Sequence, residues 1–122
     1  MAYIDGYLIP IPSDRREAYR EKADQAAAIF KKHGATRIVE CWGDDVPDGK
    51  LTDFKLSVKL EPGESVVFSW VEWPSKDVRE STKEAIFEEM RAVMGDEPML
   101  FDGKRMIFGG FDVILDTGPS PS

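Results

Sequence analysis

Four carboxylates occur in segments whose side chains alternate in the manner of β-strands: Asp5, Glu40, Glu72 and Asp112. Successive strand residues point to opposite faces of a sheet, and we expect these four to share one face. Asp5, Glu72 and Asp112 are predicted to meet at one end of that face on three neighbouring strands. Strands lie about 4.8 Å apart, so neighbouring carboxylates would come within roughly 5–8 Å and at least one pKa would be raised. The three are therefore candidate catalytic acids or bases for proton transfer, or ligands for a hard cation.

A structural explanation of the same carboxylates stays open. Carboxylates at strand ends commonly form a solvated rim, or they pair with basic side chains, for which Arg37, Lys104 and Arg105 are available. Structural ion pairs also shift pKa values, so a shifted pKa would not by itself identify a catalytic group.

Large apolar side chains have the same alternation as the carboxylates and are expected on the same face. An aromatic face left in water is uncommon on a monomer, so it predicts either a binding cavity or contact with a second copy. Residues that could bind a small organic ligand there are Tyr7, Glu40, Trp42, Phe68, Trp70 and Phe108. The opposite face, with side chains such as Ile4, Leu8, Val39, Val67 and Phe111, is expected to lie beneath helices.

No other motif predicts a specific chemistry. His33 has no second histidine or cysteine nearby, and its position before Gly34 favours a role at a helix end. Cys41 has no C-x-x-C partner, and we expect it to be buried. No glycine-rich phosphate loop is present, and the acidic run at Asp44 and Asp45 lacks the pattern of a calcium loop. We predict no cofactor and no metal site.

The composition fits one soluble globular domain of 122 residues, with 42% hydrophobic and 32% charged residues. A net charge of −7 disfavours nucleic acid and anionic membranes as partners. No apolar run is long enough to span a bilayer, and the beginning of the chain lacks the features of a secretory signal. A single cysteine excludes an internal disulfide and suits the cytoplasm.

The elements that must position the candidate residues are predicted from side-chain periodicity. Strands are expected at residues 3–10, 35–46, 65–73 and 101–115, where the last follows a turn at Asp102-Gly103. Helices are expected from Ser13 to Gly34 and from Ser75 to Gly95, each capped by its serine hydroxyl and ended by its glycine. The inner stripe of the first helix is expected to contain Tyr19, Ala23, Ala26, Ala27 and Phe30. Residues 51–60 could form an extra strand or an ordered loop. We expect one domain over residues 1–116 and a disordered tail at 117–122.

The order strand, helix, strand, strand, helix, strand predicts an α+β fold of the ferredoxin-like type. In this βαββαβ sandwich, two helices cover one face of an antiparallel four-stranded sheet. The first strand lies between the third and the fourth.

Four segments resemble the YbaA-like family of small bacterial proteins of unknown function: YIDGYLIPIP at 3–12, ECWGDDVPDGK at 40–50, VVFSWVEW at 66–73 and FDGKRMIFGGF at 101–111. This resemblance implies membership of the dimeric α+β barrel superfamily, in which two sheets face each other across a dimer. It implies no catalytic residues, because the family has no established activity. Relatives in the superfamily include cofactor-independent monooxygenases and small-molecule isomerases or lyases, which is an analogy of fold only.

Together these observations predict a homodimer that binds a small organic molecule in an acidic, aromatic cavity between two sheets. Cofactor-free proton-transfer or oxygenase-type chemistry is the enzymatic version of this hypothesis. The alternative is a non-enzymatic structural or partner-binding dimer with a solid interface.

Overall fold

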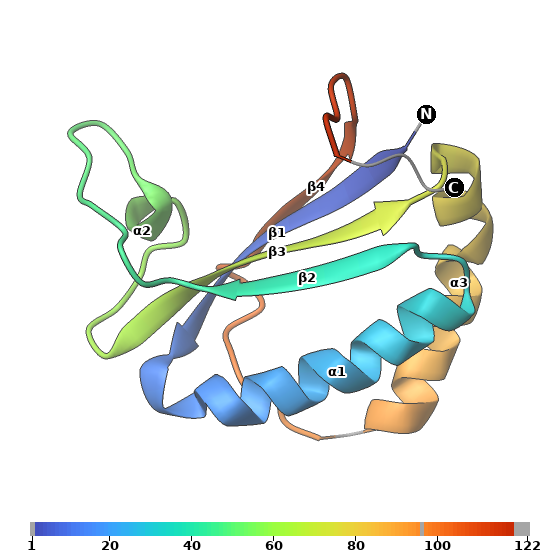
Figure 1. Cartoon of the computed structure of the whole chain (residues 1–122). Helices are drawn as coiled ribbons and strands as arrows, with labels where there is room; N and C mark the ends of the chain where they lie inside the picture. Colours follow the sequence, from blue (N-terminus) through green and yellow to red (C-terminus); the bar gives the residue numbers. More distant parts are fainter. Residues whose placement is uncertain (1, 96, 119–122) are drawn as a thin grey trace.

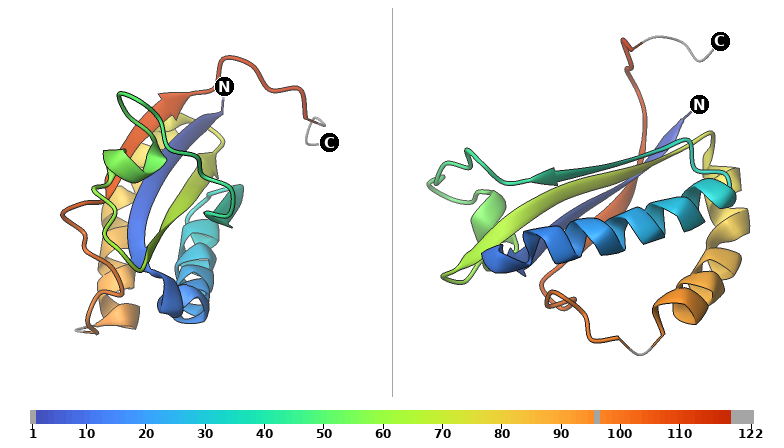
Figure 2. Two further views of the ribbon diagram at one scale, coloured as in Figure 1. Left: turned by 90° about the vertical axis from the view of Figure 1, so that its left-hand side faces the viewer. Right: turned by 60° about the horizontal axis from the view of Figure 1, so that its bottom comes forward.

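The computed structural model, described at residues 2–95 and 97–118, is a four-stranded antiparallel sheet with two long helices on one side (Figure 1). The strand order is β2-β3-β1-β4. This is the predicted ferredoxin-like order, and the right-hand view of Figure 2 also shows both long helices on the same side of the sheet. The elements are β1 (Tyr3–Pro12), η1 (Ser13–Arg15), α1 (Arg16–Lys32), β2 (Arg37–Trp42), α2 (Phe54–Ser57), β3 (Glu64–Trp73), α3 (Lys76–Met94) and β4 (Ile107–Asp112).

The two long helices begin differently. At α3 the prediction is confirmed, because the Ser75 hydroxyl accepts a hydrogen bond from the Val78 amide at 3.2 Å, and Gly95 follows the last turn with φ at 55°. At α1 the predicted cap is wrong. Ser13 begins a 3₁₀ turn, and its hydroxyl contacts that of Ser65 at 2.7 Å. This hydrogen bond joins η1 to β3, and Ser13 makes it in place of a local cap on the helix.

Two expected strands are shorter than predicted. β4 covers only residues 107–112 of the expected 101–115, and β2 covers 37–42 of the expected 35–46. Residues 51–60 form neither a strand nor a simple loop, because they contain the short helix α2. Asp53 caps α2 by accepting the Leu56 amide at 2.6 Å. Of the predicted tail, residues 119–122 lie outside the described residues.

The strand register overturns the predicted division of side chains between the two faces. Ile4 lies opposite Glu72, whereas Asp5 lies opposite Val71 and Tyr7 lies opposite Ser69. Directly opposed residues share a face. Relative to the side chains of β1, those of β3 therefore point to the opposite face from the one predicted, an offset of one residue between the two strands. The face toward the helices carries Tyr3, Asp5, Tyr7, Ile9, Ile38, Glu40, Trp42, Val67, Ser69, Val71, Trp73, Phe108 and Asp112; the bare face carries Ile4, Leu8, Arg37, Val39, Cys41, Phe68, Trp70, Glu72, Ile107 and Phe111.

The buried side chains beneath the helices form two clusters. One contains Tyr3, Trp73 and Ile86, and the other contains Ile9, Ile11 and Tyr19. Tyr7 packs against both clusters from β1. The core is thus divided, and the division leaves room for the cavity described below.

A glycine in β4 supports the first of these clusters. Glycine within a strand is typical of a bulge or of a place where another group comes close to the backbone. A Cβ at residue 110 would clash with the ring and hydroxyl of Tyr3, which lies on the neighbouring strand. Gly110 is therefore needed where an aromatic side chain approaches the β4 backbone.

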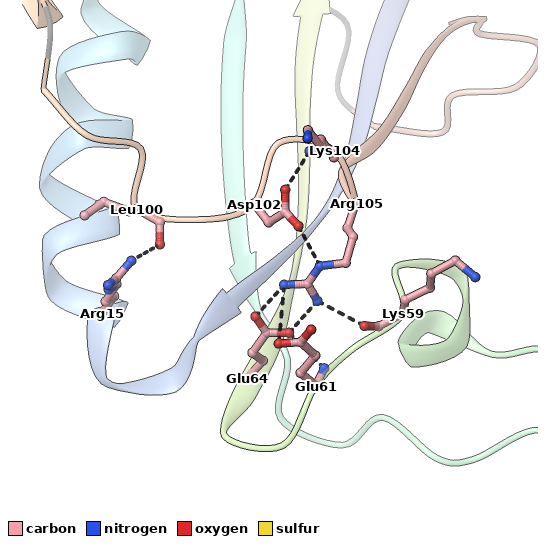
Figure 3. Close-up of polar contacts among 8 residues, drawn as sticks. All are labelled: Arg15, Lys59, Glu61, Glu64, Leu100, Asp102, Lys104 and Arg105. Carbon is pink, nitrogen blue, oxygen red and sulfur yellow. Dashed lines mark hydrogen bonds and ion pairs between the residues drawn. The ribbon is translucent and has the colours of Figure 1, made fainter.

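The approach to β4 is held by Arg105 rather than by strand pairing (Figure 3). Its guanidinium donates to both carboxylate oxygens of Glu64, at 2.7 and 2.8 Å, and to Asp102 at 3.0 Å. It also donates to the Lys59 carbonyl at 3.0 Å. Arg15 donates to the Leu100 carbonyl at 2.7 Å, so two arginines attach the segment before β4 to the start of β3 and to η1.

Candidate functional site

A cavity of about 590 Å³ lies between the sheet, the two long helices and the segment that follows α3. Its floor is formed by central residues of β1, β2 and β3, and its walls by α1 and α3. Small side chains on α1 create much of the space, because Ala23 and Ala26 line the cavity where larger residues would fill it. The lining is mostly apolar and includes Ile9, Phe30, Val71, Phe87, Met90, Met94, Met99, Leu100, Phe101 and Met106.

A single carboxylate projects from the sheet into this apolar lining. Glu40, on the outer strand β2, accepts the Tyr19 hydroxyl at 2.5 Å on one oxygen and the Ser69 hydroxyl at 2.8 Å on the other. The two donors come from α1 and β3, so three elements fix the position of the carboxylate. Glu40 nevertheless remains exposed, which leaves its other acceptor positions open to a ligand.

The two tyrosines of the cavity remain protonated well above neutral pH. Burial, followed by the neighbouring Asp5 carboxylate, raises the pKa of Tyr7 to about 12. Burial also raises the pKa of Tyr19, and the Glu40 carboxylate raises it further by repulsion and by accepting its hydrogen bond. Both phenols therefore act as hydrogen-bond donors at physiological pH.

The remaining charged groups lie at the rim. Lys22 of α1 forms an ion pair with Glu97, across the opening to the segment after α3. The Arg91 guanidinium lies over the Phe87 ring, 4.7 Å from its centroid. A cation over an aromatic face is stabilised there by the ring electrons.

The structure does not bring the three catalytic candidates together. Asp5 is buried beneath α3, where Arg79 binds both its oxygens at 2.7 and 3.2 Å and the Trp73 indole donates at 2.9 Å. Its acceptor positions are occupied by its own chain, so the structural explanation holds for this residue.

Glu72 lies on the opposite face of the sheet from Asp5. It accepts the Trp70 indole at 2.9 Å and lies 3.7 Å from Arg37, one of the basic partners considered above. Asp112 is on the helix face at the exposed end of β4, opposite Tyr3. A cluster of Asp5, Glu72 and Asp112 on one face was therefore a wrong expectation.

The six ligand-binding candidates are divided between the two faces. Tyr7 and Glu40 line the helix-side cavity. Trp42 lies beside it, with its ring 6.5 Å from that of Tyr19 and beneath Arg16. Phe108 stacks on Tyr7 at 6.2 Å but is exposed at the edge of the sheet. Phe68 and Trp70 lie on the bare face. Residues that line the cavity but were not among the candidates include Tyr19, Ser69, Phe87 and Met90.

The bare face is apolar and hollowed only slightly. Phe68 contacts the ring of Phe54 from α2 at 6.2 Å and that of Trp70 at 5.6 Å. A groove of about 290 Å³ lies beside them, and its lining contains no charged residue. Phe68, Ile107 and Phe111 expose 47%, 42% and 60% of their surface, and exposed apolar side chains that lie together commonly mark an interaction surface.

Other kinds of site find no support in the described ranges. Residues 2–95 and 97–118 contain no group of three histidine, cysteine, aspartate or glutamate side chains placed to hold a metal. Within the same ranges, no helix has the length and hydropathy needed to cross a membrane. Cys41 is exposed, contrary to the prediction, because its strand faces it away from the helices. His33 ends α1 as expected and contacts Glu89 at 2.9 Å.

The sequence and the fold were compared with known proteins. The uncharacterized protein YbaA of Escherichia coli (strain K12) is 53% identical over 116 residues, which cover 95% of this chain and 99% of that protein. YbaA of Shigella flexneri matches equally well. A crystal structure of a MhuD variant with two manganese protoporphyrin IX molecules bound per active site has a TM-score of 0.65. It is 14% identical, covers 96% of this chain and 99% of its own, and shows a shared fold.

The resemblance stated from the four sequence segments is thereby confirmed. The model of a protein family described as a protein of unknown function, DUF1428, matches residues 2–103. This chain therefore belongs to the DUF1428 family, together with the uncharacterized YbaA proteins.

Proposed function

We propose that this protein is a cytoplasmic homodimer that binds a small, mainly apolar organic molecule in the cavity between the sheet and the helices. The observation that carries the proposal is the position of Glu40, a carboxylate held by two hydroxyl donors in a mostly apolar cavity of about 590 Å³. Ligand sites are commonly concave and apolar, with a few polar groups that orient the ligand. This moves the proposed site from between two sheets to the helix side.

A ligand explains why the core is divided at this position. Filling the space would require only larger side chains than Ala23 and Ala26, which already lie on the inner side of α1. Unfilled apolar space costs stability, because the lining loses its packing contacts. An occupant would restore those contacts.

The fold neighbour suggests the shape of ligand to test first. MhuD, with the same fold, is described with manganese protoporphyrin IX, a large flat molecule. Since a shared fold does not imply a shared function, the proposal takes from this only that flat apolar probes are suitable. Whether any chemistry follows binding is a separate hypothesis, and Asp5, Glu72 and Asp112 have no common position from which to perform it.

The dimer rests on the bare face. Its large side chains, Leu8, Phe68, Trp70, Ile107 and Phe111, would gain roughly 1.5–3 kcal/mol each from full burial. The groove beside them is smaller than the helix-side cavity and has no charged residue in its lining, which favours a protein surface as its cover. If no ligand binds, this face supports the alternative, a structural dimer with a solid interface.

The proposal is tested by titrating the protein with N-phenyl-1-naphthylamine, a neutral bicyclic probe that fluoresces in apolar surroundings. The wild type is expected to bind it, and Ala26→Phe to lose binding at least about tenfold, because the new ring occupies the cavity. Ala28→Phe is the matched control, since Ala28 is exposed on the same helix. Equal binding by the two variants would show that the probe binds elsewhere and would overturn the helix-side site.

A further inference from the structure

The charge inside the cavity defines which ligands it accepts. Glu40 accepts one hydrogen bond on each oxygen, and both donors are neutral hydroxyls. An ionised carboxylate offers about four acceptor positions, so about two remain for a ligand. None of the ion pairs formed among the described residues includes Glu40. The negative charge of Glu40 is thus stabilised but not balanced.

The basic groups near the cavity already have partners of their own. Lys22 pairs with Glu97 at the rim, and Arg91 lies against the Phe87 ring. An anionic ligand would have to compete with Glu97 for Lys22 or bind the N–H groups of Arg91, and it would also approach the Glu40 carboxylate. A cationic ligand would meet neither obstacle, and the net charge of −7 attracts it from solution.

We propose that the cavity selects molecules with a flat apolar body and a protonated nitrogen, and that the nitrogen donates to Glu40. This inference rests on the proposed function, and it adds the class of ligand. The body packs between α1 and α3, while the ammonium or protonated heteroaromatic nitrogen replaces the water that otherwise occupies the open positions of the carboxylate. A hydrogen bond to an ionised group is roughly twice as strong as one between neutral groups.

The test uses three naphthalenes of similar size as competitors against N-phenyl-1-naphthylamine at neutral pH. They are 1-naphthylmethylamine, which is a cation, 1-methylnaphthalene, which is neutral, and 1-naphthoate, which is an anion. The cation is expected to displace the probe at a concentration about tenfold lower than the neutral compound. Naphthoate is expected to be the weakest competitor.

Variants then assign the preference to one residue. Glu40→Gln keeps the shape and one acceptor oxygen but removes the charge and replaces the other oxygen with an NH2 donor, and it should bring the cation to within about threefold of the neutral compound. Glu21→Gln removes an equal charge from the exposed side of α1 and should leave the preference intact. Wild-type protein provides the comparison among the three compounds, so the result does not depend on the stability of a variant.

The outcomes separate the two proposals. Displacement by methylnaphthalene without a preference for the cation overturns this inference and leaves the cavity as the binding site. Stronger binding of naphthoate also overturns it and indicates that Arg91 or Lys22 orients the ligand. Failure of all three compounds to displace the probe overturns this inference, whereas equal probe binding by Ala26→Phe and Ala28→Phe overturns the proposed function as well. A cation preference that survives in Glu40→Gln excludes Glu40 as its cause.

Discussion

The two faces of the sheet carry similar numbers of large apolar side chains but treat polar groups differently. On the helix face, Asp5 and Glu40 are bonded to Arg79, Trp73, Tyr19 and Ser69 of the same chain. On the bare face, the polar contacts described are at one end, where Glu72 meets Trp70 and Arg37. Buried polar groups need partners, whereas exposed apolar groups need only a cover. The first face is completed within one chain except for its cavity, whereas the second is the face that we propose to lie in the dimer interface.

The largest effect is expected from a charge placed on the bare face. Phe68→Arg replaces a half-exposed ring between Leu8 and Cys41, and the symmetry of a dimer would place two such arginines in one interface. Loss of about 1.5–3 kcal/mol for each ring weakens association at least about a hundredfold. Light scattering after size exclusion at micromolar concentration should show a shift from twice 13.7 kDa to 13.7 kDa.

The control for this variant is Val93→Arg, an equally exposed site on α3 that should leave the mass of the particle unchanged. If the wild-type protein elutes as a monomer, the bare face is not a dimer interface and the proposed difference between the two faces is wrong.

A smaller effect is expected from removing one arginine on each face. Arg79→Met leaves the buried Asp5 carboxylate with only the Trp73 indole, and loss of one partner of a buried pair costs about 3–5 kcal/mol. We expect the lower end of this range, because Arg79 is partly exposed. Arg37→Met removes an exposed partner 3.7 Å from Glu72 and should change the free energy of unfolding by less than about 1 kcal/mol. Urea denaturation of the two variants at equal protein concentration compares the faces directly. Equal losses of unfolding free energy would contradict the proposed difference between the two faces.

The smallest effect concerns the pH dependence of the helix face. The pKa of Tyr7 is raised to about 12 in the folded protein, so the unfolded chain loses this proton first as the pH rises. The stabilisation from Tyr7 is complete below its ordinary pKa of 10.0 and is lost between about pH 10 and pH 12. Stability should therefore fall with rising pH in this range, and the fall should be shallower in Tyr7→Phe. Identical slopes in the wild type and the variant would show that burial of Tyr7 does not control its titration.

The fold could be predicted from the sequence because its signals are local. The alternation in β3, the cap at Ser75 and the glycines at Gly34 and Gly95 each identify an element without reference to the others. The order of the elements then leaves few possible topologies. The late start of β4 was not predictable in the same way. Arg105, in the segment before β4, binds Glu64, which is 41 residues away in the sequence.

The candidate site was predicted only in part, because it depends on register. Both faces of this sheet contain large apolar residues. The sequence therefore does not indicate which of the two alternating sets of side chains in each strand faces the helices. The offset of one residue between β1 and β3 separates Asp5 from Glu72, and it places Ser69 rather than Phe68 and Trp70 on the face of Tyr7 and Glu40. Tyr19 belonged to the predicted inner stripe of α1, and its place among alanines was the signal that the sequence offered for the cavity.

The central strand β1 has a consequence for how chains of this kind can vary in length. Tyr7 on this strand faces the cavity, and its neighbour Leu8 faces the other way. An insertion or deletion of one residue in the middle of β1 would exchange the two sets of side chains beyond that point. Substitutions in β1 can be absorbed one at a time, whereas gaps cannot. Natural gain or loss of residues is instead expected between β2 and β3, where α2 lies outside the sheet.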